Sequence, residues 1–272
     1  MTGEDSIKVA KEGVSLVVEV IKAAGDNPQV KEAASNLGQT AVTLTKTINN
    51  VLVPLAAINF AFDKARIYFA GKFQQEIAEK TSEIPPEHIV EPKASIAGPM
   101  LQGLAFTHEE PDLKEMYLNL LATSMDGRTA SVAHPAFVEI IKQLDSVDAK
   151  MIRGLLQSRV AIPIVQIHKK LPGNGGYNVL IEHLLNLSDP QGEAAERVGV
   201  PAMVDNWIRL GLVSVAYDKF FTDEALYSWV ERRPEFLRLS QEPQSDGAKV
   251  EFQKGILQCT SLGKRFADAV GL

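Results

Sequence analysis

The sequence predicts a mainly α-helical protein, with a helical N-terminal region followed by an α+β, winged-helix-like C-terminal region. Apolar residues recur at helical spacing through most of the first half. The second half places short β-branched segments between helical ones, in the order helix, strand, helix, helix, strand, strand, helix. We therefore expect N-terminal amphipathic helices over residues 1–40, a helical domain over 41–144 and the winged-helix-like domain over 145–272.

Proline and glycine mark the expected helix boundaries in the first half. Pro54 lacks a backbone donor and should kink or split a long helix, whereas Pro111 suits the first turn of another. Asp145 is a suitable N-cap for the helix that follows it. The expected helices cover residues 5–23, 40–80, 95–106, a segment that begins at Pro111, 135–144 and 145–156.

The second half alternates between strand and helix signals. Residues 172–176, Pro-Gly-Asn-Gly-Gly, form a loop, and Gly211 ends a helical stretch that should break near residues 199–201. Thr260 or Ser261 can cap the last helix. The expected strands are 161–168, 212–215 and 250–259, and the expected helices are 177–187, 193–210 and an insertion over 223–239.

Composition limits the compartment and the classes of partner. The formal net charge of −6 over 272 residues argues against a nucleic-acid partner, which usually requires a basic surface. Cys259 is the only cysteine, so an internal disulfide and a cysteine-only metal cluster are excluded. The N-terminus lacks the pattern of a secretory signal, and we therefore expect a cytoplasmic protein.

Catalytic patterns are missing from the sequence. The 5 histidines never lie three or four residues apart, and we expect no catalytic constellation, no metal and no cofactor. Asp126 and His134 are the candidate functional residues, in a loop between two helices; a cap on the helix that starts at Pro135 is the simpler role for His134. The acidic residues over 109–115 are best explained by a helix N-terminus.

Two uncharged segments raise the question of a membrane. They cover residues 47–62 and 94–107. Both are shorter than the run of about 20 apolar residues that a spanning helix needs. We expect them to be buried in the resting protein, and insertion after a rearrangement is left open.

The stretch 193–210 is the candidate interaction helix. Arg197, Asn206 and Arg209 could contact a partner, or DNA if the winged helix is correct. Glu193, Glu196 and Asp205 lie in the same stretch and would repel phosphate, so protein contact is the better expectation. Arg232 and Arg233 are expected to be a solvated pair.

Several motifs together resemble the abortive infection alpha family. They are Met125-Asp126, the run HPAFVEIIKQL from His134, the element NWIRLGLV from Asn206 and the closing TSLGKRF from Thr260. The resemblance covers about residues 45–270. It implies a bacterial role in phage defence, in which an infected cell stops growing or dies before the phage matures. It supplies no catalytic residues.

The sequence therefore predicts an antiphage protein that acts without catalysis. We expect contacts with a phage or host protein, or a membrane-active rearrangement, and the N-terminal helix could also join copies of the chain. The alternative is a winged-helix DNA-binding transcriptional regulator. A hydrolase would need convergent carboxylates and histidines, which the sequence does not indicate.

Overall fold

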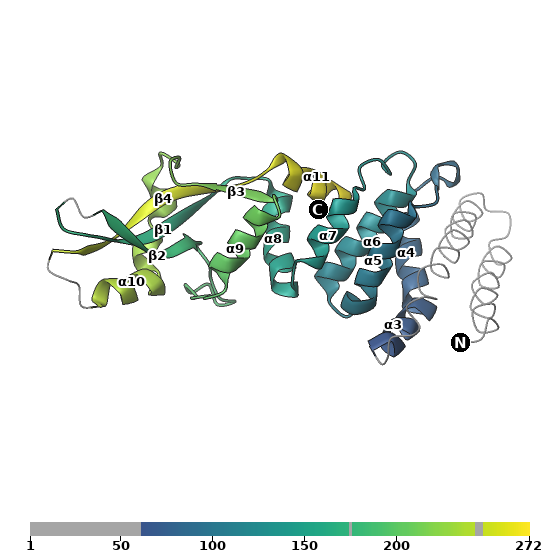
Figure 1. The fold of residues 1–272 in the computed structure, drawn as a ribbon, viewed down its shortest axis with the longest axis horizontal. Coiled ribbons are helices and arrows are strands. Elements are labelled where there is room, and N and C mark those ends of the chain that lie inside the picture. Colours follow the sequence, from purple (N-terminus) through teal and green to yellow (C-terminus); the bar gives the residue numbers. More distant parts are fainter. Residues whose placement is uncertain (1–60, 174–175, 243–246) are drawn as a thin grey trace. The chain divides into compact units, whose positions relative to one another are not determined.

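The fold is that of a computed structural model, which describes residues 61–173, 176–242 and 247–272. About half of this part of the chain is helical, and four strands form an antiparallel sheet. Two compact units are present: the first ends at Met151 and also takes in Arg265–Leu272, and the second is Ile152–Lys264 (Figure 1). The expected helices over residues 1–40, and the part of the long helix before residue 61, lie outside the described residues.

The first unit is built from helices (Figure 1). Their buried side chains form an apolar interior. The helices predicted from residue 95, Pro111, Pro135 and Asp145 are confirmed, and Asp145 Oδ1 accepts a hydrogen bond from Asp148 N at 2.7 Å, as an N-cap should. The helices are α3 (Ala61–Ala70), α4 (Lys72–Thr81), α5 (Ala94–Thr107), α6 (Pro111–Met125), α7 (Pro135–Lys142) and the start of α8 (Ser146–Ser158), with a short 3₁₀ helix η2 (Pro86–His88).

Close contacts join α5, α6 and the C-terminal helix α11 (Ser261–Ala269). A methyl group on Gly103 of α5 would lie only 2.3 Å from Tyr117 Cζ of α6, so glycine lets the tyrosine ring pack on the helix backbone. The side chains of Asn119 and Thr123 on α6 donate to the carbonyls of Val270 and Ala269 at 2.8 and 2.9 Å. These bonds satisfy acceptors that the end of a helix leaves open.

The second unit is a sheet with helices packed against it. The strand order is β2-β1-β4-β3 and every neighbouring pair is antiparallel. Helix α9 (Val200–Arg209) packs against β2 and β3, and α10 (Pro234–Gln241) against β4. The strands are β1 (Ile162–Lys170), β2 (Tyr177–Leu184), β3 (Val213–Ala216) and β4 (Lys249–Cys259), and the 3₁₀ helices η3 (Glu224–Tyr227) and η4 (Val230–Arg232) lie between β3 and α10.

The predicted fold class is wrong in two respects. Residues 177–184 form β2 rather than a helix, which gives the four-stranded sheet in place of a winged helix. The helical N-terminal region is not supported, because residues 1–60 lie outside the described residues. Gly173 and Gly176 adopt φ of +65° and +74° and turn the chain back, so that β2 pairs with β1 and the ladder overrides the local apolar spacing.

Among the described helices, none combines the length and apolar character needed to cross a membrane. The uncharged segment 94–107 is helix α5 itself, and its residues from Ile96 to Ala105 contribute much of the core of the first unit. The other uncharged segment, 47–62, lies almost wholly outside the described residues.

Candidate functional site

The candidate site lies at the end of β2, where a β-bulge changes the direction of the side chains. Val165 of β1 pairs with Leu184, whereas Ile167 pairs with Ile181, so β2 contains one extra residue between the two pairs. His183, in this bulge, has φ of +56°, a left-handed conformation that is uncommon for residues other than glycine. Such bulges often redirect a side chain beside a functional site.

The imidazole of His183 is held by residues from two other elements. Its Nε2 lies 3.2 Å from Asp205 Oδ1 on α9, and its Nδ1 lies 3.0 Å from the Tyr217 hydroxyl, just after β3. The backbone N–H of His183 also donates to that hydroxyl at 3.1 Å. His183 is 7 % exposed, whereas the Asp205 side chain is 63 % exposed, so the cluster joins the interior to solvent.

The hydrogen bonds suggest which nitrogen carries the proton. The Tyr217 oxygen accepts the His183 backbone N–H and is free to donate its own proton to Nδ1. Nε2 then carries the imidazole proton, and this N–H group donates a hydrogen bond to the Asp205 carboxylate. Burial raises the pKa of Tyr217 to about 12, which keeps the phenol protonated at neutral pH.

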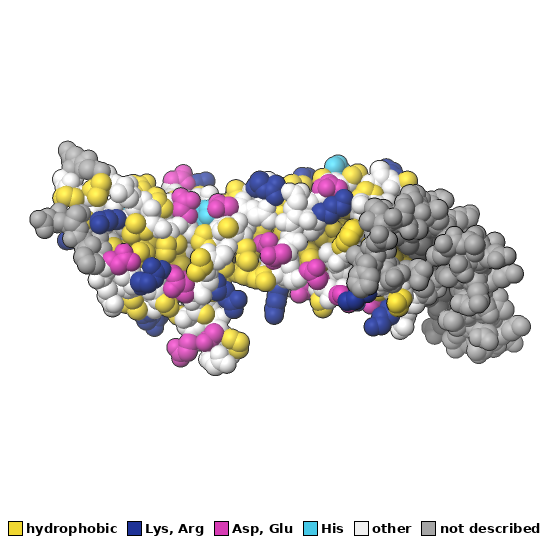
Figure 2. Space-filling view, turned by 60° about the horizontal axis from the view of Figure 1, so that its bottom comes forward, with side chains coloured by type: hydrophobic (Ala, Val, Ile, Leu, Met, Phe, Trp, Pro, Cys, Tyr) yellow, Lys and Arg dark blue, Asp and Glu magenta, His cyan; other side chains and the backbone are white. Residues whose placement is uncertain are grey.

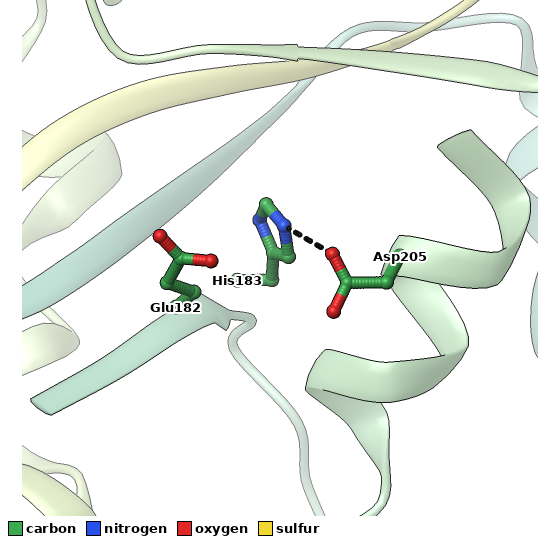
Figure 3. A group of neighbouring side chains, drawn as sticks. All are labelled: Glu182, His183 and Asp205. Atoms are coloured by element: carbon green, nitrogen blue, oxygen red, sulfur yellow. Dashed lines mark hydrogen bonds and ion pairs between the residues drawn. The ribbon is translucent and has the colours of Figure 1, made fainter. Parts of the chain in front are cut away.

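Glu182 completes the cluster from the solvent side. Its carboxylate accepts a hydrogen bond from Nε2 of the buried Gln166 at 3.0 Å. Candidate ligand atoms of Glu182, His183 and Asp205 all lie within 4.8 Å of one another. Figure 3 shows the imidazole between the two carboxylates, which come from β2 and α9. One nitrogen and two carboxylates at this spacing could hold a cation or move a proton.

A pocket of about 230 Å³ opens beside this cluster. Its apolar wall comes from the end of β2, the following loop and the start of α9, and charged side chains stand at its edge. Figure 2 shows hydrophobic side chains gathered among Lys, Arg, Asp and Glu side chains on the second unit. The lining residues are Ile181, His183, Leu184, Leu185, Leu187, Glu196, Arg197, Val198, Val200, Pro201, Arg233, Glu235 and Arg238.

Arg233 and Glu235 form a buried ion pair that shapes this pocket. Two nitrogens of the guanidinium contact the two carboxylate oxygens of Glu235 at 3.0 and 2.7 Å. The guanidinium also donates to the carbonyls of Leu187 and Ala195. Arg233 is 1 % exposed, so the expectation of a solvated arginine pair is wrong for Arg233 and holds only for Arg232, which is exposed.

The structure separates the two predicted loop residues, Asp126 and His134. Asp126 is buried and binds Arg128 through both carboxylate oxygens, at distances from 2.6 to 3.0 Å. The hydrogen bond from Arg128 lowers the pKa of Asp126. His134 is the N-cap of α7, and its Nδ1 accepts from Ala136 N at 3.1 Å. Both side chains have evident structural roles.

The residues of the predicted interaction helix are also distributed differently. Helix α9 begins at Val200, so Arg197 lies in the preceding loop, at the edge of the pocket. Asp189 Oδ1 accepts hydrogen bonds from the N–H groups of Gln191 and Glu193, which stabilises a turn that ends at the first residue of the predicted helix. On α9, the Arg209 guanidinium donates a hydrogen bond to Asn206 Oδ1 at 2.6 Å. That Arg197, Asn206 and Arg209 contact a partner stays a prediction.

Sequence reasoning missed Glu182, His183, Tyr217, Arg233 and Glu235. His183 lies 22 residues from Asp205 and 34 from Tyr217, so no local motif connects them. The available signal was the Gly-rich loop at 172–176. A hairpin turn at this loop would have predicted that the segment after it, which carries His183, is a strand. The bulge itself depends on the pairing of β2 with β1.

Comparison with known proteins identifies the family of this chain. No curated protein and no solved structure matches the chain. The abortive infection alpha family matches residues 65–270, which include most of the described part of the first unit, all of the second unit and the whole candidate site. Because this match covers most of the sequence, the chain belongs to the abortive infection alpha family.

Proposed function

We propose that this protein acts in bacterial defence against phage by abortive infection, and that it does so by binding a phage or host protein through the pocket of the second unit. Family membership supports the defence role. The pocket supports a protein ligand, and it is the observation that carries the proposal.

The size and lining of the pocket suit an apolar side chain of a partner protein. A volume of about 230 Å³ is smaller than the roughly 300–1,000 Å³ that is usual for small-molecule sites. An apolar wall with Glu196, Arg197 and Arg238 at its edge resembles the anchor pockets of protein interfaces, in which one buried residue is surrounded by polar contacts. Val198, at the same edge, is 87 % exposed and available to a partner.

Strand β2 extends the same surface. It is an edge strand, and Tyr177, Val179 and Leu180 are exposed along it. An unpaired strand edge with apolar side chains is a common place for another chain to bind. A partner could therefore contact both the pocket and the neighbouring edge.

The same family role could be carried out by a membrane-active rearrangement. Helix α5 would then have to leave the first unit, which would expose Met100, Leu101 and Leu104, all of them fully buried. Full burial of such side chains is worth roughly 1.5–3 kcal/mol each. Protein binding needs no such exposure, and we favour it for that reason.

The test is a charged substitution at the edge of the pocket, Val198→Asp, in cells challenged with a phage against which the wild-type protein protects. We expect the plaque count to rise toward that of cells without the protein, because a carboxylate in an apolar contact weakens binding about tenfold for each 1.4 kcal/mol lost. Val160→Asp is the matched control, since Val160 is 61 % exposed in the same unit and does not line the pocket.

Three results would contradict the proposal. Full protection by the Val198→Asp protein would exclude the pocket as the binding site. Loss of membrane potential on infection, unchanged in the Val198→Asp protein, would favour membrane action. If the wild-type protein protected against none of a broad panel of phages, the defence role itself would be wrong.

A further inference from the structure

We propose that Glu182, His183 and Asp205 form a binding site for a divalent transition-metal ion, with Zn²⁺ as the best-suited ion. The sequence predicted no metal, because the three residues are on two elements and share no metal-binding motif. The proposal is independent of the partner-binding role.

The donor atoms fit a zinc ion in number and kind. Zn²⁺ binds imidazole nitrogen and carboxylate oxygen at about 2.0–2.2 Å, so neighbouring ligands in a tetrahedron lie about 3.3–3.6 Å apart. The His183 and Asp205 donors are 3.2 Å apart, and all three residues offer ligand atoms within 4.8 Å. Glu182 is exposed, so its carboxylate has room to move closer to the other two donors when an ion binds.

Neighbouring residues form hydrogen bonds with the proposed ligands, as they commonly do around the ligands of known metal sites. Metal-bound histidine usually donates its second N–H to an oxygen, which fixes the ring. The Tyr217 oxygen is placed to accept a hydrogen bond from Nδ1–H, and Gln166 donates a hydrogen bond to one oxygen of Glu182, leaving the other oxygen to coordinate. With metal on Nε2, the imidazole proton moves to Nδ1 and the Tyr217 oxygen accepts both His183 N–H groups.

The backbone also favours this arrangement. The left-handed conformation of His183 is strained, and such strain collects at binding sites. Gly255 of β4 makes room for the Tyr217 ring, since a methyl group there would lie 2.6 Å from Tyr217 Cδ1. Three ligands leave a fourth position open for water, which is the pattern of zinc sites that bind or activate a further molecule.

Calorimetric titration of the untagged, full-length protein with ZnCl₂ tests the site. We expect one Zn²⁺ per chain, little binding of MgCl₂, which prefers oxygen ligands, and a visible absorption spectrum when CoCl₂ replaces zinc. His183→Asn and Asp205→Asn should each weaken Zn²⁺ binding at least about tenfold. Asparagine tolerates the left-handed conformation at 183, so the bulge is kept.

Matched controls separate a metal site from general surface binding. His134→Asn removes an exposed imidazole and keeps a good N-cap, and Asp218→Asn removes an exposed carboxylate beside Tyr217. Both should bind Zn²⁺ like the wild type. If the wild type binds Zn²⁺ no more tightly than the His183→Asn protein, with both folded by circular dichroism, the cluster is only a structural contact and the proposal is wrong.

Discussion

The two units of the protein differ in how deeply their ion pairs lie. In the first unit the interior is mostly apolar, ion pairs such as Lys64 with Glu109 are exposed, and the buried Asp126 pairs with an Arg128 side chain that is half exposed. In the second unit, Arg233 and Glu235 pair in the interior, and His183 is buried in a strained bulge.

This difference indicates where each unit gains its stability and where recognition resides. Apolar helix packing is stable without any buried charge. A buried ion pair is costly to desolvate, and apolar residues of similar volume often replace it without loss of stability. We infer that the second unit keeps its buried polar groups to shape a site, although the motif residues Asp126 and His134 belong to the first unit.

The largest expected effect tests the buried pair of the second unit. Arg233→Met leaves the Glu235 carboxylate without its partner, and also removes the donors to the Leu187 and Ala195 carbonyls. We expect the free energy of unfolding to fall by about 3–5 kcal/mol, measured by urea denaturation. Arg238→Ala, which breaks a pair with Glu196 at the surface, should cost no more than about 1 kcal/mol. Equal effects of the two changes would show that the buried pair of the second unit stabilises the fold no more than a surface pair does, and would remove the ground for contrasting this unit with the first.

A smaller effect tests the packing of the first unit. Gly103→Ala places a methyl group against the Tyr117 ring, and overpacking of this kind costs about 1–3 kcal/mol. Gly154→Ala is the comparison, because a methyl group at that helical position meets nothing within 4 Å and should stabilise the protein by about 0.5–1 kcal/mol. Thermal unfolding of both variants shows whether each substitution raises or lowers the stability. A stabilising Gly103→Ala change would show that the helices of the first unit are not closely fitted.

The smallest effect concerns the loop ion pair of Asp126 and Arg128. Because the pKa of Asp126 is lowered in the folded protein, its carboxylate stabilises the fold above the ordinary aspartate value of 3.8 and loses that contribution as the pH falls through the folded pKa. Asp126→Asn should therefore destabilise the protein slightly at pH 7, by less than either change above, since the Arg128 side chain is half exposed. Denaturation at pH 7 and at a series of pH values that extends well below 3.8 checks this, because the folded pKa lies below that value. A difference that persists unchanged in acid would point to packing as the cause.

Local sequence signals were reliable where a helix needs only its own residues. Pro111 begins α6 and Asp145 caps α8, as the sequence indicated. Gly211, with φ of +73°, ends the helix before β3, where its N–H and that of Leu212 bond to the carbonyls of Ile208 and Trp207. Thr260 Oγ1 accepts from Gly263 N at 2.9 Å and caps α11.

The local signals failed where hydrogen bonds to distant residues replace the hydrogen bonds of a predicted helix. Residues 177–184 carry apolar groups at spacings that suit a helix, but pairing with β1 satisfies their backbone groups in a ladder instead. Residues 193–199 have helix-forming glutamates and alanines, yet the Asp189 turn and the Arg233 contact to Ala195 hold them in a loop. Both outcomes depend on residues that are remote in sequence.

The sequence alone determined the family, the positions of most helices and the structural explanation for His134, because these depend on neighbouring residues and on composition. The tertiary structure decided the sheet, the pocket and the cluster of Glu182, His183 and Asp205. The physical reason is that a bulge, a buried ion pair and a set of converging donors exist only after distant strands have paired, and no spacing within one segment records that pairing.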